Sequence, residues 1–143
     1  MRQEQSMSRQ FFIAIGLGLL AGYSWSSEPP VPILELMVAT VAPASDTLWG
    51  VEDPQADEEW QVLDDAAITI VEAFEQAKLG GNGPTDAAWA SEPKWQAYAD
   101  EEIIAGRAAR DAIAARDLDA LFAAGDLLYT PCEACHIDYN PRL

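Results

Sequence analysis

The chain has 143 residues, half of them hydrophobic, which is enough for one compact domain that needs no disulfide to fold. Eight basic residues against 24 acidic ones give a formal net charge of −16. A surface of this charge repels phosphate groups, so it argues against nucleic acid and against anionic lipid as partners.

Residues 1–26 have the pattern of a secretory signal peptide. Arg2 and Arg9 are followed by the apolar run FFIAIGLGLLAGY at 11–23. This run has the length of a signal-peptide core and is short for a membrane-spanning helix. Small residues then allow cleavage after Ser26, so we expect a mature domain in the periplasm. The alternative is an uncleaved signal that tethers the domain to the inner membrane.

Residues 27–32 form a proline-rich linker, and the rest of the chain, 33–143, is expected to be one helical domain. The first helix is predicted from about Ile33 to Trp49, because apolar residues recur there with helical spacing. Pro43 lies inside this helix and should kink it, since proline removes one hydrogen bond and crowds the preceding turn.

The second helix is predicted from about Asp57 to Leu79, with an acidic start that suits the positive end of the helix dipole. It should end at the breaker cluster GGNGP, residues 80–84. The third helix should begin near Glu92 and Pro93, with proline in the first turn, and end before a short connection at Arg116-Asp117.

The fourth helix should begin with Asp117 or Asp119 as its cap. It should present one broad face made of Leu121, Phe122, Gly125, Leu128, Tyr129, Cys132, Cys135, His136 and Tyr139. Pro131 interrupts this helix. Because Thr130 and Pro131 also resemble a new helix start, we expect the helix to be kinked there or broken and restarted. Four such helices with mostly short loops predict an all-α, up-down-up-down antiparallel four-helix bundle.

Cys132, Cys135 and His136 form the sequence CEACH, which is the attachment signature of c-type haem. Residues three apart share one face of a helix, so both thiols can reach the vinyl groups along one haem edge. His136 can then bind the iron as the proximal ligand. The motif therefore predicts one covalently attached haem c.

Other interpretations of CEACH remain as alternatives. A thioredoxin-like redox pair would lie between a strand and a helix, and no such pattern is visible. A structural disulfide suits an exported protein, but so short a loop would add little stability. Zinc takes about four ligands, whereas the chain offers two cysteines and one histidine.

With CEACH on the last predicted helix, the sequence resembles the class II c-type cytochromes, the cytochrome c-prime group. Tyr139, three residues after His136, and Met37, within LELMVAT on the first helix, carry the likeness further. In low-spin members a first-helix methionine is the sixth iron ligand, so the resemblance implies Met37 as the distal ligand. Met37 is also the only methionine outside residues 1–26.

One position departs from the family pattern. Many members carry arginine four residues after the haem-binding histidine, whereas here that position is Asn140 and the next arginine is Arg142.

The resemblance implies an exported electron carrier with axial ligands His136 and Met37. The alternative is a five-coordinate, cytochrome c-prime-like protein that binds NO or CO. The acidic composition predicts a redox partner with a basic docking patch, and the family makes a homodimer an expectation. No catalytic constellation is present, since the chain has one histidine and GGNGP lacks phosphate-loop spacing. We therefore expect neither an enzyme nor a small-molecule substrate.

Overall fold

The computed structural model describes residues 30–140; the predicted signal peptide and the first part of the linker lie outside this range. Within it the chain is all-helical, with no strand. The elements are α1 (Ile33–Leu36), the π-helical turn η1 (Met37–Val41), α2 (Ala42–Trp49), α3 (Asp57–Leu79), α4 (Asp86–Ala90), α5 (Pro93–Ala115) and α6 (Leu118–Tyr139). The all-α class predicted from the sequence is confirmed. No helix in this part of the chain is long and apolar enough to span a membrane.

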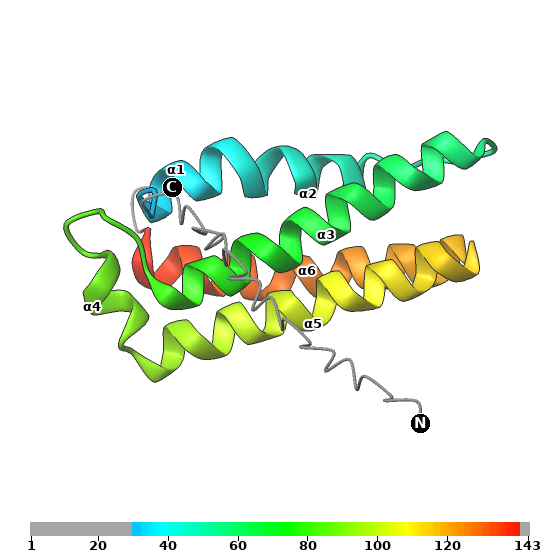
Figure 1. Ribbon diagram of the computed structural model, residues 1–143. Helices are drawn as coiled ribbons and strands as arrows, with labels where there is room; N and C mark the ends of the chain where they lie inside the picture. The colour runs from blue at the N-terminus through cyan, green and yellow to red at the C-terminus, as the bar shows by residue number, and fades with distance from the viewer. Residues whose placement is uncertain (1–29, 141–143) are drawn as a thin grey trace, which may run out of the picture.

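The long helices lie side by side around one apolar core (Figure 1). α5 packs along both α3 and α6, and α2 packs along α3. α6 runs back along α5 so that its last turns lie at the same end of the molecule as α1 (Figure 1). Ile70, Leu121 and Leu128 are among the largest side chains removed from solvent, and they mark the centre of the core.

Small side chains let α5 approach its neighbours closely. Ala105 and Ala109 are almost completely buried. Gly106 faces α3 directly, because a Cβ atom at this position would lie 2.9 Å from Cγ2 of Val71 and 3.3 Å from Cγ2 of Ile70. The contact between α3 and α5 therefore depends on the missing side chain at position 106.

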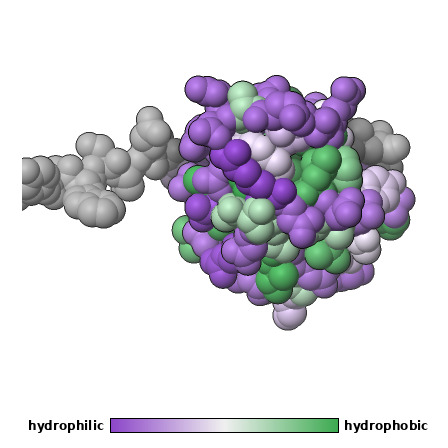
Figure 2. All heavy atoms as spheres, turned by 90° about the vertical axis from the view of Figure 1, so that its right-hand side faces the viewer, coloured by the Kyte–Doolittle hydropathy of each residue, from purple (hydrophilic) through white to green (hydrophobic). Residues whose placement is uncertain are grey.

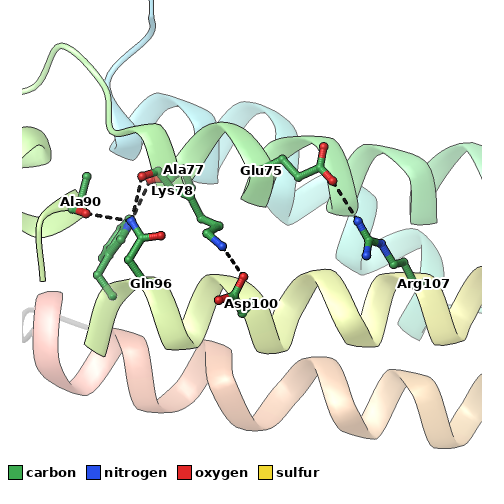
Figure 3. A network of polar contacts seen from close by, with 8 residues as sticks. Glu75, Ala77, Lys78, Ala90, Gln96, Asp100 and Arg107 are labelled. Atoms are coloured by element: carbon green, nitrogen blue, oxygen red, sulfur yellow. Dashed lines mark hydrogen bonds and ion pairs between the residues drawn. The ribbon is translucent and has the colours of Figure 1, made fainter. Parts of the chain in front are cut away.

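Polar contacts also join α3 to α5 (Figure 3). Arg107 Nη2 donates a hydrogen bond to Glu75 Oε1 at 3.1 Å, and Lys78 pairs with Asp100. Gln96 Nε2 donates to the carbonyl oxygen of Lys78 at 2.9 Å. Because the ion pairs are largely exposed, each contributes only about 0–1 kcal/mol to stability.

The kink predicted at Pro43 takes the form of a π-helical turn. Proline has no N–H for the carbonyl of Ala39, and its ring crowds that carbonyl. η1 lies immediately before the proline, and the backbone N–H of Ala42 donates to the carbonyl of Met37, five residues back. The wider turn relieves the crowding without breaking the helix. α1, η1 and α2 thus form one continuous helical run, and Gly50 follows it as predicted.

α6 continues from Leu118 to Tyr139 with Pro131 inside it. The alternative of a break and restart at Thr130 is therefore wrong, because packing of the whole helix along α5 outweighs the hydrogen bond that Pro131 removes. At the other end, the Asp117 side chain accepts a hydrogen bond from the Ala120 N–H at 3.0 Å. Asp117, and not Asp119, is the cap.

The short helix α4 was not expected from the sequence, and it anchors the loop that follows α3. Gly80 ends α3 with a positive φ of 85°. At Gly81 a Cβ atom would lie 2.5 Å from Oδ2 of Asp86, so only glycine allows this approach. The buried Asp86 carboxylate accepts hydrogen bonds from the backbone N–H groups of Ile33 and Gly83, both at 2.8 Å. This contact ties the start of the first helical run to α4.

The end of the molecule at which α5 turns into α6 has a largely hydrophilic surface with smaller apolar areas (Figure 2). Arg110 and Arg116, near the end of α5, pair with Asp64 and Asp57 on α3. Together with Arg107 they line a hollow of about 720 Å³ between the two helices. Their charges are therefore balanced by acidic neighbours.

Candidate haem-attachment site

The CEACH sequence occupies the last turns of α6. Cys132 and Cys135 are half-buried and His136 is exposed. The two cysteines are free thiols. Because the helix is continuous here, Cys132 and Cys135 lie one turn apart, as the attachment motif requires.

A cavity of about 610 Å³ opens beside this turn. Its α6 wall has the spacing i, i+3, i+4, i+7, i+8 and i+11, which is a single helical stripe: Tyr129, Cys132, Glu133, His136, Ile137 and Asn140. Trp49 of α2 completes the lining. The volume is within the range of about 300–1,000 Å³ that is usual for ligand and cofactor pockets. The structure therefore brings Cys132 and His136 to one cavity.

The broad apolar face predicted for the fourth helix divides into two stripes. Leu121 and Leu128 are buried in the core, whereas Phe122 is 46% exposed and Tyr129 is 56% exposed. Cys135 packs against the core, and Cys132 lines the cavity. The turn of α6 that carries Cys132, Cys135 and His136, called the attachment turn below, therefore lies at the boundary between the core and the open cavity.

Trp49 holds the end of α2 against α6. Its Nε1–H donates to the carbonyl of Gly125 at 3.0 Å, and its ring meets Tyr129 edge-on with centroids 6.5 Å apart. Trp49, Tyr129 and Ile137 nevertheless expose 45%, 56% and 71% of their surface. The cavity therefore has an apolar rim on which a ligand could pack.

The carboxyl group of Glu102, on α5, contacts Cys132, the first cysteine of CEACH. Glu102 is 1% exposed, and its Oε1 accepts a hydrogen bond from Cys132 Sγ at 2.8 Å. Its Oε2 is buried and has no partner within the described part of the chain. Burial raises the pKa of Glu102 to about 7; the Cys132 hydrogen bond lowers it, and the charge of Glu101 raises it. An almost fully buried acid therefore contacts the attachment turn.

Both thiols are held in the protonated form. Burial is the main cause that raises the pKa of Cys132 far above its ordinary value, and the charge of Glu102 is the second cause. The same two causes raise the pKa of Cys135 to about 11. Such cysteines are poor thiolate nucleophiles and poor ligands for a free metal ion. Among residues 30–140, no group of three or more His, Cys, Asp and Glu side chains is arranged to hold a metal ion.

A cluster of aromatic side chains fixes the end of α6 just beyond His136. The Tyr139 ring stands edge-on to Trp95 at 5.1 Å and to Trp89 at 5.6 Å, and these two tryptophans stack on each other. Its hydroxyl donates to Glu92 Oε2 at 2.8 Å. These contacts orient the helical turn that carries His136.

A second contact from α5 holds the same turn. The Tyr98 hydroxyl donates to Asp138 Oδ2 at 2.7 Å, and Lys94 pairs with that carboxylate at 2.5 Å. Lys94, which donates to the carboxylate, and Tyr98 keep the pKa of Asp138 below its usual value. The final turn of α6 is therefore held on the side of α5, and its opposite side faces the cavity.

Met37 is the first residue of η1; it is half-buried and packs against the core. The first helical run and α6 lie antiparallel (Figure 1), and Trp49 contacts Gly125. Equal lengths of helix counted from this contact lead to Met37 on one run and Ile137 on the other. Met37 thus lies toward the same end of the molecule as the last turns of α6, but it is not among the residues that line the cavity.

The residues at this site fit a covalently attached haem in three respects. The cavity has the size and the apolar rim that a flat ring requires. Both cysteines are free, as the formation of two thioethers requires. His136 lines the cavity and is exposed there. No arginine lines this cavity within the described residues; Arg107, Arg110 and Arg116 pair with acids on α3.

The sequence leaves Trp49, Trp60 and Trp95 open as haem-packing or core residues, with core favoured; Trp60 and Trp95 are buried, whereas Trp49 lines the cavity. Two further residues of this site are not identified by the sequence pattern. Helical spacing assigns Tyr129 only to the broad apolar face. Glu102 lies seven residues after Trp95, on the apolar stripe of its helix. A charged residue on such a stripe is a usable signal, and it could have pointed to this acid.

Comparison with known proteins finds no matching family model, no similar curated protein and no similar solved structure.

Proposed function

We propose that the chain is an exported c-type cytochrome with one covalently bound haem that carries single electrons. The observation that carries the proposal is the placement of Cys132 and His136 on one wall of the 610 Å³ cavity, with Cys135 on the same turn of α6. Only a haem uses two cysteines and the following histidine in this way. The function of the chain is then binding and electron transfer, with no enzymatic reaction.

In this proposal each residue of the turn has a separate role. Cys132 and Cys135 add their thiols to the vinyl groups and so retain the cofactor in a small domain. His136 holds the iron as the proximal ligand. The bound haem supplies the iron that changes between the ferrous and ferric states. Trp49 and Tyr129 cover part of the ring and keep water from it.

The finer architecture also belongs to the proposal. The helix order and the antiparallel course of α5 and α6 support an up-down-up-down four-helix bundle of the cytochrome c-prime type. In this description α1, η1 and α2 together are the first helix, and α4 belongs to the connection between the second and third. The signal peptide at 1–26 and export to the periplasm rest on the sequence alone.

Met37 is proposed as the distal iron ligand. Its place toward the same end of the molecule as the last turns of α6 supports this role, and so does the π-helical turn that it begins, since such turns are frequent at functional sites. A methionine–histidine pair raises the reduction potential and suits electron transfer.

One observation favours a second candidate function. Met37 packs against the core and does not line the cavity. If Met37 keeps this position when haem is bound, the iron has five ligands, and the protein binds NO or CO. The two candidates share the same attachment site and differ only in the distal ligand.

The proposed partner of the electron carrier is a redox protein with a basic docking patch. The net charge of −16 supports electrostatic steering of such a partner. The association rate should then fall as ionic strength rises, and a rate that does not depend on salt would remove this part of the proposal. A homodimer stays an expectation from the family resemblance, and nucleic acid remains disfavoured as a partner.

The attachment of haem is tested by expressing the full chain together with a c-type haem-attachment system. The pyridine haemochrome spectrum of the purified protein should be that of a haem bound through two thioethers. Cys132→Ser and Cys135→Ser should each change this spectrum to the single-thioether type or abolish attachment. Release of the haem from the wild-type protein on acid-acetone extraction would refute covalent attachment.

The distal ligand is tested in the same protein by absorption spectroscopy. A ferric haem bound by methionine sulfur shows a weak long-wavelength charge-transfer band, which Met37→Ala should abolish. Leu34→Ala, a change at an exposed apolar position on the same helix, should retain the band. A high-spin spectrum in the wild type that shifts on addition of CO would instead support the gas-binding function.

A further inference from the structure

Glu102 is the buried ionisable group that the proposed function leaves without a role. It lies on α5 with 1% of its surface exposed, and one of its oxygens contacts the cysteine that would be bonded to the haem. The other oxygen is buried without a partner among residues 30–140. A buried carboxylate is costly unless it is paired and hydrogen-bonded, so such a site favours the protonated acid.

We propose that Glu102 is a redox-linked proton site, which holds a proton while the iron is ferrous and releases it when the iron becomes ferric. The inference rests on the proposed attachment of haem at Cys132. The balanced step is the uptake of one electron from a one-electron donor, a reduced redox protein, together with one proton from water. The electron reduces ferric iron to ferrous, and the proton binds the Glu102 carboxylate.

Attachment of the haem would strengthen the preference of Glu102 for the protonated form, because it removes the hydrogen bond from Cys132. When Cys132 adds to a vinyl group, its S–H bond breaks, a carbon–sulfur bond forms, and the hydrogen ends on the other vinyl carbon. Oε1 then loses the only donor that the structure gives it. With both oxygens unpartnered, the neutral acid is favoured further, and its pKa in the ferrous protein should lie above the value of about 7 in the free chain.

Oxidation acts in the opposite direction. Ferric haem carries one more positive charge than ferrous haem, and an opposite charge nearby favours the ionised carboxylate. The interaction is strong because Glu102 lies in the interior, where charges are little screened. The pKa of Glu102 therefore differs between the ferrous and the ferric protein. At pH values between these two pKa values, reduction of the iron is accompanied by uptake of a proton.

The other charged groups around Glu102 do not replace it in this role. On α6, Cys132 contacts it and Cys135 is close enough to be affected by its charge, but both would be consumed as thioethers. On α5 the neighbour is Glu101, which is exposed and raises the pKa of Glu102. On α3, Glu75 and Lys78 face α5, and they form ion pairs there with Arg107 and Asp100.

The experiment is an optical redox titration of the haem-bearing full chain between about pH 5 and pH 9, a range that brackets both expected pKa values. In the wild type the midpoint potential should fall as pH rises. The slope should approach about 59 mV per pH unit, since a tenfold change in proton concentration corresponds to 59 mV for a one-electron couple. Glu102→Gln, which keeps the shape and removes the proton, should lose this slope.

Glu101→Gln is the matched control, because it removes the same charge from the adjacent exposed position. This variant should keep the slope of the wild type. A slope that comes from the haem propionates would persist in Glu102→Gln and would overturn the proposal. A wild-type potential that does not depend on pH would overturn it as well.

A second measurement needs only the wild-type protein and can overturn the proposal even if Glu102→Gln fails to fold. Redox-triggered infrared difference spectra should show the C=O stretch of a protonated carboxylic acid that appears on reduction and is lost on oxidation. Absence of this band from the haem-bearing protein would overturn the role of Glu102. Absence of covalent haem overturns the proposed function and this inference together, whereas a haem-bearing protein without the band overturns the inference alone.

Discussion

The carboxylate of Asp86 caps the helical run that carries Met37. Its Oδ2 accepts a hydrogen bond from the backbone N–H of Ile33 at 2.8 Å, across 53 residues of sequence. The first N–H groups of a helix have no partner within the helix, and a carboxylate oxygen is one of the acceptors that cap them well. The contact is buried, so it holds the start of the first helical run in place relative to α4.

Asp86→Ala should destabilise the domain by about 1–3 kcal/mol, because buried N–H groups of Ile33 and Gly83 would lose their acceptor. Asp86→Asn should cost less, since both bonds go to Oδ2 and an amide oxygen in that position can still accept them. Denaturant unfolding followed by circular dichroism measures both. Asp126→Ala, which removes an exposed acid from α6, is the control and should change the free energy of unfolding by less than about 0.5 kcal/mol. An unchanged stability of Asp86→Ala would contradict the capping role.

Glu102 should make the stability of the haem-free protein fall as pH rises. Its pKa is about 7 in the folded chain, against an ordinary value of 4.5. Below about pH 4.5 the acid is protonated in both states, so it has no effect there. Between pH 4.5 and 7 the unfolded chain loses the proton more readily, and above pH 7 the cost to the folded state reaches roughly 3 kcal/mol.

The check is the difference in free energy of unfolding between Glu102→Gln and the wild type at several pH values. This difference should grow in favour of the variant from about pH 4.5 to pH 7 and then stay constant. Subtracting one protein from the other removes the titration of carboxylates that both share. A difference that does not change with pH would mean that Glu102 ionises normally in the folded chain.

Gly106 and Val71 should show strong energetic coupling. Gly106→Ala places a methyl group 2.9 Å from Val71 Cγ2, and such overpacking costs about 1–3 kcal/mol. The higher helix propensity of alanine returns about 1 kcal/mol. In a Val71→Ala background the 2.9 Å contact is removed and only the 3.3 Å contact with Ile70 Cγ2 remains, so the same substitution should cost clearly less. A double-mutant cycle measured by thermal unfolding tests this, and additive effects would contradict close packing at this point.

Trp49 should contribute to stability through both its ring and its N–H. Trp49→Phe keeps an aromatic ring beside Tyr129 but removes the hydrogen bond to the Gly125 carbonyl, at a cost of about 1 kcal/mol. Trp49→Ala should cost more, because it also removes the packing between α2 and α6. Thermal melts of the two variants give the order. Equal melting temperatures for the wild type and Trp49→Ala would show that α2 and α6 are held together elsewhere.

The sequence by itself determined the helical class, the bounds of the long helices and the position of the attachment turn. α3 occupies the predicted range Asp57–Leu79, and Asp117 caps the last helix. These features depend on contacts within a few residues, such as apolar spacing, caps and breakers, and they can be read locally. The same holds for the placement of Cys132, Cys135 and His136 on one helix, from which the proposal of haem attachment starts.

The tertiary structure alone decided which residues surround that turn. Asp86 caps a helix 53 residues away, and Glu102 meets Cys132 across 30 residues. The π-helical turn before Pro43 and the unbroken helix through Pro131 show two different responses to a proline within a helix. Local pattern could not separate these outcomes, because each is set by packing against elements far away in the sequence. Burial likewise distinguishes Glu102 from the other acidic residues. Among residues 30–140 it is the one acid that contacts Cys132 and has a buried oxygen without a partner.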